Sequence, residues 1–177
     1  MADENFVAVA GQYASEAEAV ADFDKLHAHY KDDKEHGHGS FDAAVINRSV
    51  DGKVSIVKRD DGGKSHGTRT GLVVGLASGV AVALFPAVAL GGALLVAGGS
   101  GAGLGAIAGH IKKKTPTSNL EAISETLDAG SAGIVVVVDP GEADEVEQLL
   151  ANASKVTRKE IAVDQEKLGE EVDGAYE

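Results

Sequence analysis

One stretch of this chain limits what it can fold into more than any other feature. Residues 70–109, forty in all, carry no formally charged side chain and lie between Arg69 and His110. An uncharged stretch of this length has to be covered by lipid, by the rest of the protein or by other subunits. The place where it is buried therefore decides much of the architecture and of the function.

Small residues recur at every fourth position within this segment, which we call the uncharged segment. These helix-packing residues form two rows, Gly71, Gly75, Gly79 and Ala83, then Ala97, Gly101, Gly105 and Gly109. Residues four apart share one face of a helix. A face of hydrogens and methyl groups lets another helix approach closely. The rows predict a glycine-zipper hairpin of two helices, over about residues 68–85 and 91–111.

The second predicted helix is rich in glycine, with eight glycines between residues 91 and 111. Each glycine costs about 1 kcal/mol of helix propensity relative to alanine. The few strongly apolar residues of this stretch offset only part of that cost. We therefore expect this helix to form only in close contact with another helix, either the first one or one from a neighbouring subunit.

The part of the chain before the uncharged segment predicts a strand, a helix and a hairpin. Residues 5–13 read as a strand, and Ser15 with Glu18 forms a capping box for a helix that reaches about residue 34. That helix is amphipathic, with Ala19, Phe23 and Leu26 on one side and Asp22, Asp24 and Lys25 on the other. Strands over residues 41–48 and 53–58 flank Asp51-Gly52, a sequence typical of a hairpin turn.

The part after the uncharged segment repeats a similar order. A helix from Thr117 or Ser118 stops at Gly130, and a second helix follows the turn at residues 139–141. Between them, residues 134–138 are five consecutive β-branched side chains, which favours a central strand covered on both faces. Residues 155–163 supply a last strand.

The order βαββ, uncharged hairpin, αβαβ predicts an α+β fold of the ferredoxin-like type with an inserted helical hairpin. We expect four parts: residues 1–67 as the first part of the ferredoxin-like domain with a linker, 68–114 as the hairpin, 115–163 as the second part of the domain, and 164–177 as an acidic tail. Because both ends of the hairpin return to one domain, they must lie near each other. An even number of helices satisfies this condition.

Charge and cysteine content exclude several functions. The chain has 28 acidic and 16 basic residues, a net charge of −12, which argues against nucleic acid as a partner. It has no cysteine, so disulfides, thiolate catalysis and zinc-thiolate sites are excluded. The acidic N-terminus lacks the features of a secretory signal. We therefore expect the polar domain to lie in the cytoplasm.

The sequence Thr68-Arg69-Thr70-Gly71, together with the glycine rows, resembles a bacterial family of predicted glycine-rich membrane proteins. Members of that family are often labelled general stress or low-temperature-induced proteins. The resemblance extends over roughly residues 6–163. It implies the fold described above and a stress context, and it implies no reaction and no catalytic residues.

Two environments remain open for the hairpin. Arg69 before it and Lys112, Lys113 and Lys114 after it are membrane-flank candidates that put both ends on the cytoplasmic side, by the positive-inside rule. This predicts a cytoplasmic membrane location with a lipid bilayer as partner. The alternative is a homo-oligomer in the cytoplasm whose subunits bury their hairpins against one another. A third possibility is a monomer that buries the segment in its own core.

No residues are predicted to be catalytic or to bind a cofactor, because no convergent set of polar side chains can be assigned roles. A less favoured alternative is metal binding by the region His27–His38, where histidines and carboxylates alternate. A solvated helix end explains the same residues, since nothing fixes their orientation. We therefore predict a non-enzymatic structural protein that self-associates, binds a membrane, or does both.

Overall fold

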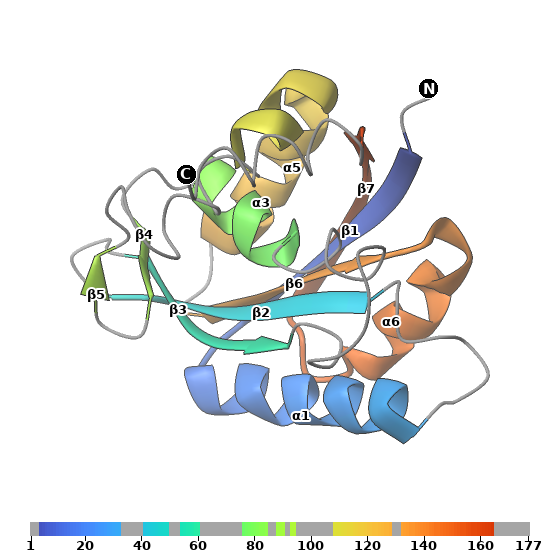
Figure 1. Cartoon of the computed structure of the whole chain (residues 1–177). Coiled ribbons are helices and arrows are strands. Elements are labelled where there is room, and N and C mark those ends of the chain that lie inside the picture. Colours follow the sequence, from blue (N-terminus) through green and yellow to red (C-terminus); the bar gives the residue numbers. More distant parts are fainter. Residues whose placement is uncertain are drawn as a thin grey trace.

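The structure, a computed structural model, describes residues 4–32, 41–49, 54–60, 76–84, 88–90, 93–94, 108–128 and 132–164. Within these ranges the chain forms a seven-stranded sheet with helices on both faces (Figure 1). The predicted α+β class is confirmed.

The elements follow the predicted order outside the uncharged segment, with ends that differ by a few residues. They are β1 (Glu4–Tyr13), α1 (Glu16–Asp32), β2 (Phe41–Arg48), β3 (Val54–Asp60), α3 (Leu76–Leu84), β4 (Val88–Leu90), β5 (Ala93–Leu94), α5 (Thr117–Asp128), β6 (Ala132–Val138), the short helix η1 (Pro140–Glu142), α6 (Ala143–Leu149) and β7 (Lys155–Val163). Residues 108–114 are also helical. The capping residue before α1 is as expected, since the backbone N–H of Glu18 donates to Ser15 Oγ.

The strand order across the sheet is β5-β4-β3-β2-β6-β1-β7. The five strands from β3 to β7 in this order pair antiparallel. The short strand β4 runs parallel to β3, and β5 pairs antiparallel with β4. Every residue of β6 is buried between β2 and β1, which confirms the central position predicted for residues 134–138.

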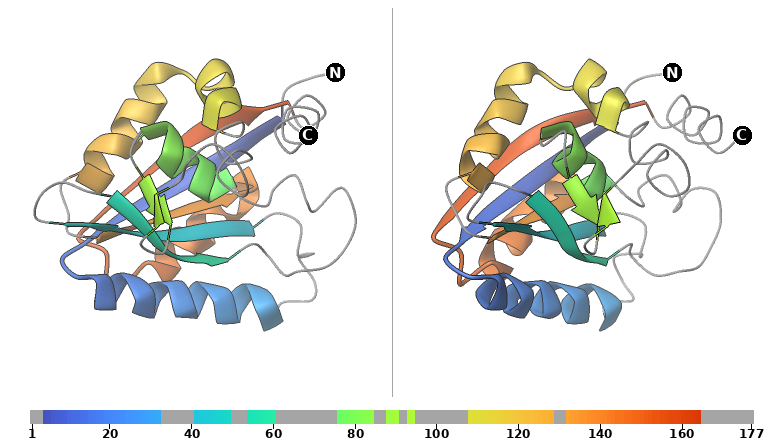
Figure 2. Two further views of the ribbon diagram at one scale, coloured as in Figure 1. Left: turned by 60° about the vertical axis from the view of Figure 1, so that its left-hand side comes forward. Right: turned by 90° about the vertical axis from the view of Figure 1, so that its left-hand side faces the viewer.

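Helices cover both faces of the sheet (Figure 2). One cover, the α1–α6 layer, consists of α1 and α6. The other, the α3–α5 layer, consists of α3, residues 108–114 and α5. Side chains alternate along each strand, so β6 sends Val136 into the core beneath the first layer and Val135 into the core beneath the second.

The predicted hairpin of two long helices is not found in the described part of the uncharged segment. Of residues 68–85, the described helix is α3, Leu76–Leu84. The second helix predicted for residues 91–111 is wrong at residues 93–94, which form β5, and helical residues resume at 108. Only Gly91 and Gly92 separate β4 from β5 in sequence, and a glycine pair favours a two-residue connection between antiparallel strands. Pairing with β3 satisfies backbone groups of β4.

Candidate functional site

The helix α3 is the described part of the uncharged segment that enters the core. Its sequence, LASGVAVAL, has no charged residue. Ala77, Val80 and Ala81 are fully buried and pack with residues of β2, β3 and β6, including Ile46, Ile56 and Val135. The small side chains let the helix lie close to the sheet. In the described part of the chain, this helix is therefore covered by the same domain.

Three predicted helix-packing residues lie in described helices. Gly79 and Ala83 belong to α3 and are buried. Gly109 belongs to the helical residues 108–114 and is half-buried, and a β-carbon placed on it would have no heavy atom within 4 Å. The other predicted residues of the two rows lie outside the described residues: Gly71, Gly75, Ala97, Gly101 and Gly105.

The predicted membrane-flank residues are partly described. Lys112 and Lys113 are exposed and Lys114 is half-buried, whereas Arg69 lies outside the described residues. No helix within the described ranges combines the length and the apolar character needed to cross a bilayer. The lysines that follow the uncharged segment are thus at least partly exposed, in a helix whose His110 binds the end of β7.

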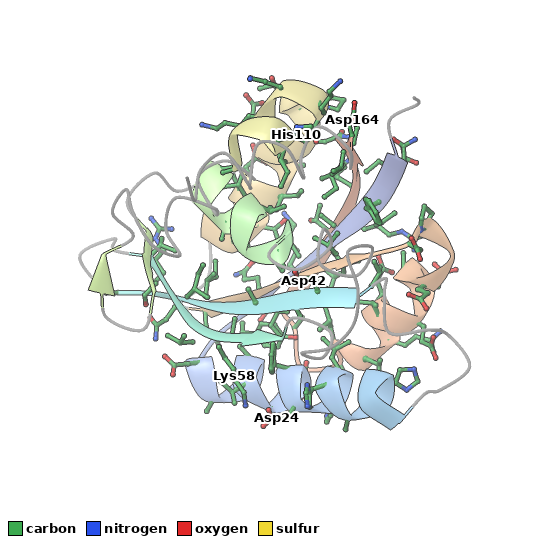
Figure 3. All side chains as sticks on the ribbon, viewed as in Figure 1. Asp24, Asp42, Lys58, His110 and Asp164 are labelled. Atoms are coloured by element: carbon green, nitrogen blue, oxygen red, sulfur yellow. The ribbon has the colours of Figure 1, made fainter. Side chains whose placement is uncertain are left out.

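Side chains from residues 110–119 bind the outer edge of β7, which has β1 on its inner side. His110 Nε2 accepts the backbone N–H of Asp164 at 2.9 Å, and both residues are buried (Figure 3). Thr115 Oγ1 accepts the backbone N–H of Ala162 at 3.2 Å. Asn119 Nδ2 donates to the carbonyl oxygen of Glu160 at 3.0 Å. These three side chains, which we call the edge clamp, join the α3–α5 layer to the edge strand.

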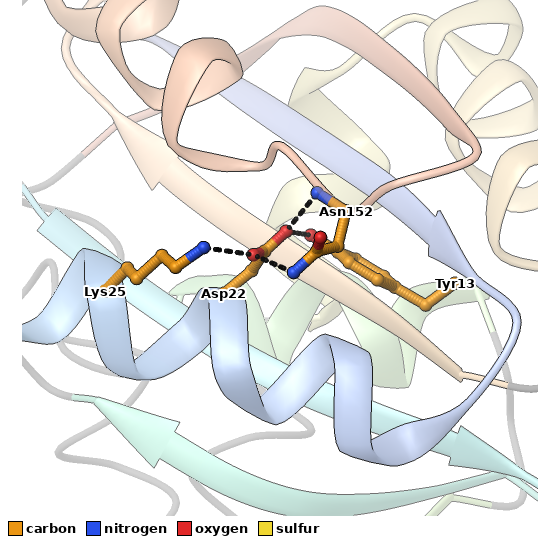
Figure 4. A network of polar contacts seen from close by, with 4 residues as sticks. All are labelled: Tyr13, Asp22, Lys25 and Asn152. Atoms are coloured by element: carbon orange, nitrogen blue, oxygen red, sulfur yellow. Dashed lines mark hydrogen bonds and ion pairs between the residues drawn. The ribbon is translucent and has the colours of Figure 1, made fainter.

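A second polar cluster joins the α1–α6 layer to the sheet (Figure 4). The carboxylate of Asp22 is fully buried and accepts three hydrogen bonds: from the hydroxyl of Tyr13 at 2.8 Å, and from the backbone and side-chain N–H groups of Asn152, both at 2.9 Å. Lys25 Nζ lies 3.6 Å from the same carboxylate. Burial raises the pKa of the Tyr13 phenol far above its ordinary value, and the hydrogen bond to Asp22 raises it further. Both oxygens of this carboxylate are therefore occupied by structural partners.

The prediction that Asp22 lies on the exposed side of α1 is wrong. The residue is three positions after Ala19 and four before Leu26, which are both buried, so helical spacing already placed it on the buried face. The edge clamp had no comparable signal. The histidine, threonine and asparagine at 110, 115 and 119 lie before, within and after a break between two helices, and their common partner is a strand more than forty residues later.

The structure describes only the first part of the region His27–His38. His27 is exposed, His29 Nε2 lies 2.9 Å from Glu145 Oε1, and His36 and His38 lie outside the described residues. Among the residues that the structure describes, no three His, Asp or Glu side chains gather in a way that could hold a metal ion. His29 links α1 to α6 when it is protonated.

Comparison with known proteins identifies one family. A family described as "Protein of unknown function (DUF1269)" matches residues 66–172, more than half of the chain. No curated protein and no solved structure matches. The matched range holds the uncharged segment together with β6 and β7, whereas β1, which lies between these two strands, precedes it.

Proposed function

The chain belongs to the DUF1269 family of proteins of unknown function, and we propose that it is a non-enzymatic structural protein that self-associates through its uncharged segment. The observation that carries the proposal is the open space at Gly109, a predicted helix-packing residue at the end of the segment. The packing of α3 into the core of its own domain argues against a separate membrane module. The described buried polar groups also support a structural role, because those of Asp22, His110, Thr115 and Thr126 join one element to another.

The surface at Gly109 supports contact with a second copy. This helical glycine is half-buried and has open space above it in the described part of the chain. The backbone of another helix can approach such a position closely, because no side chain stands in the way. In this proposal the partner is a second copy of the same chain, which fills the space above Gly109.

Light scattering coupled to size exclusion tests the proposal. We expect a mass above that of one 18.0 kDa chain, and we expect Gly109→Leu to lower it. Nothing lies within 4 Å of a β-carbon added at Gly109, whereas a leucine side chain there would block a closely packed neighbour. The matched control is Gly141→Leu, at an exposed glycine that also has open space around it. A wild-type protein that is monomeric at all concentrations would contradict the proposal.

Membrane association is a second candidate function. The exposed side chains of Lys112 and Lys113 favour it, because they stand directly after the uncharged segment and would attract anionic lipid headgroups. It predicts that the full chain floats with anionic vesicles and less with neutral ones, and that replacing both lysines with glutamine weakens flotation. Recovery of all the protein in the vesicle-free fraction would exclude it under those conditions.

Two finer proposals accompany the function. We propose that the fold is ferredoxin-like; the order β2-β6-β1-β7 and the placement of α1 and α6 on one face support this. An experimental structure with a different strand order would contradict it. The stress context that the family resemblance implies is also proposed. It predicts that the protein becomes more abundant after cold or general stress, which immunoblotting can measure, and an unchanged abundance would count against it.

A further inference from the structure

The edge clamp covers one half of the outer edge of β7. In an antiparallel pair the backbone groups of alternate residues face the partner strand. The N–H of Ala162, the N–H of Asp164 and the carbonyl of Glu160 bind side chains instead of β1, so these even-numbered residues face outward. By the same alternation, Val156 and Arg158 present their backbone groups to this edge. The histidine is the member of the clamp whose charge can change.

We propose that His110 is a protonation-sensitive latch: its neutral ring holds the 108–114 helix on the edge of β7, and protonation of the ring releases that edge. The inference is independent of the self-association proposed above, because it concerns one contact within a single chain. The contact is the hydrogen bond of 2.9 Å between Nε2 and the backbone N–H of Asp164.

The chemistry of imidazole supplies the switch. A ring nitrogen that accepts an N–H must carry a lone pair, and the doubly protonated ring has only donors. Protonation of Nε2 therefore turns an attractive contact into one between two N–H groups. Histidine is the side chain that ordinarily changes charge between about pH 5 and pH 8. His110 is only 2% exposed, so water cannot simply replace the lost partner while the helix stays in place.

Charged residues also lie on the elements around His110. At the end of β7, Asp164 is buried. On the helix itself, Lys112 and Lys113 are exposed and Lys114 is half-buried. On β1, Glu4 pairs with Val163. The helix α3 has no charged residue, and the first turn of α5 has no acidic one.

Release of the latch has a defined structural effect. The N–H of Asp164 loses its acceptor first, and Thr115 and Asn119 are the remaining contacts of the clamp. A strand edge with unpaired backbone groups can then exchange with solvent or pair with another strand. Acid would thus uncover the end of this edge, at Asp164, without unfolding the sheet.

Amide hydrogen exchange of the full chain, followed by NMR, tests the latch. Between about pH 8 and pH 5, we expect the protection factor of the Asp164 amide to fall by about tenfold or more, the factor that corresponds to one lost buried hydrogen bond. Protection factors already remove the intrinsic effect of pH on exchange. The amide of Arg158, on the same edge but without a described side-chain acceptor, is the internal reference and should change little.

Two variants separate the latch from general acid effects. In His110→Gln the side-chain oxygen can accept the N–H at any pH, so protection of Asp164 should persist at about pH 5. The control His27→Gln replaces an exposed histidine on α1 and should keep the wild-type response. Should His110→Gln fail to fold, Thr115→Val provides the second measurement: it removes a neighbouring acceptor, so protection of Ala162 should fall at both pH values. An Asp164 protection factor that is independent of pH in the wild type, or that falls equally in His110→Gln, overturns the proposal.

Discussion

At the scale of single residues, several of the described buried polar groups hold distant elements together. Asp22 accepts hydrogen bonds from residues 9 and 130 positions away, on β1 and on the turn before β7. Its carboxylate is buried but has a donor for each oxygen, which is the condition under which a buried charge is tolerated. Tyr13 is the partner whose ionisation would break the arrangement.

Tyr13 predicts a loss of stability in alkali. Its pKa is raised in the folded protein, so the neutral phenol is favoured there over the unfolded chain, where the value is about 10. The contribution of the neutral Tyr13 phenol to the free energy of unfolding is fully present below about pH 10. Above that pH it falls by up to about 1.4 kcal/mol per pH unit. Urea unfolding at pH 8 and at pH 11 measures the difference.

A phenylalanine variant isolates this effect from the titration of lysines. Tyr13→Phe should be less stable at pH 8 by about 1 to 3 kcal/mol, yet it should lose less stability between the two pH values. If the loss in alkali is the same in Tyr13→Phe, the phenol is not its source.

Gly133 predicts a second effect at the residue scale. A β-carbon at this position of β6 would lie 2.7 Å from Leu127 Cδ2 and 3.1 Å from the carbonyl oxygen of Gly11. Gly133→Ala should therefore cost about 1 to 3 kcal/mol in unfolding free energy, as overpacking does. Gly141→Ala, where nothing lies within 4 Å, should stay within about 0.5 kcal/mol of the wild type. Equal midpoints in chemical denaturation for the two variants would show that the close approach is not a constraint.

At the scale of elements, α3 decides how the sheet face opposite α1 is covered. The helix is nine residues long, so its stability comes from packing rather than from its own length. Its buried residues are Ala and Val, which brings its backbone near β2 and β6. The element therefore depends on close contact with the sheet, whereas the small residues of the uncharged segment had predicted close contact with another helix.

Two valines with the same chemistry test this dependence. Val80 of α3 is fully buried, whereas Val57 of β3 is 39% exposed. Val80→Ala should lower the unfolding free energy by about 1 to 3 kcal/mol, from lost burial and a small cavity. Val57→Ala should change it by less than about 0.5 kcal/mol. Both are measured by urea denaturation, and equal effects would mean that α3 does not pack as described.

At the scale of the whole molecule, one sheet serves two cores. Neighbouring residues of the same strand enter opposite clusters, as Val135 and Val136 of β6 do. The two layers pack on opposite faces of the same strands. Unfolding of either layer would expose one face of strands whose other face is still buried. The two layers are therefore coupled through the sheet.

This coupling predicts one cooperative unfolding transition. Val80→Ala in the α3–α5 layer and Phe23→Leu in the α1–α6 layer should each shift the same midpoint. Far-UV circular dichroism and tyrosine fluorescence, recorded on the same urea series, check it. Two separate midpoints in either variant would show that one layer unfolds independently.

The sequence by itself determined the elements outside the uncharged segment and the central place of β6. Alternating and helical patterns, the Ser15 cap and the run of β-branched residues at 134–138 act through near neighbours, so they can be read along the chain. The predicted helix-packing residues stay a prediction for the most part, because five of the eight lie outside the described residues.

Tertiary structure alone decided how the described part of the uncharged segment is used. Its strands β4 and β5 exist because β3 offers an open edge, a partner that no local pattern reveals. The edge clamp and the Asp22 cluster likewise join residues that are brought together only when the sheet has formed. The spacing of apolar residues along the chain indicates which residues are buried. The partner of a buried polar group depends instead on the strand order, which is a property of the assembled sheet.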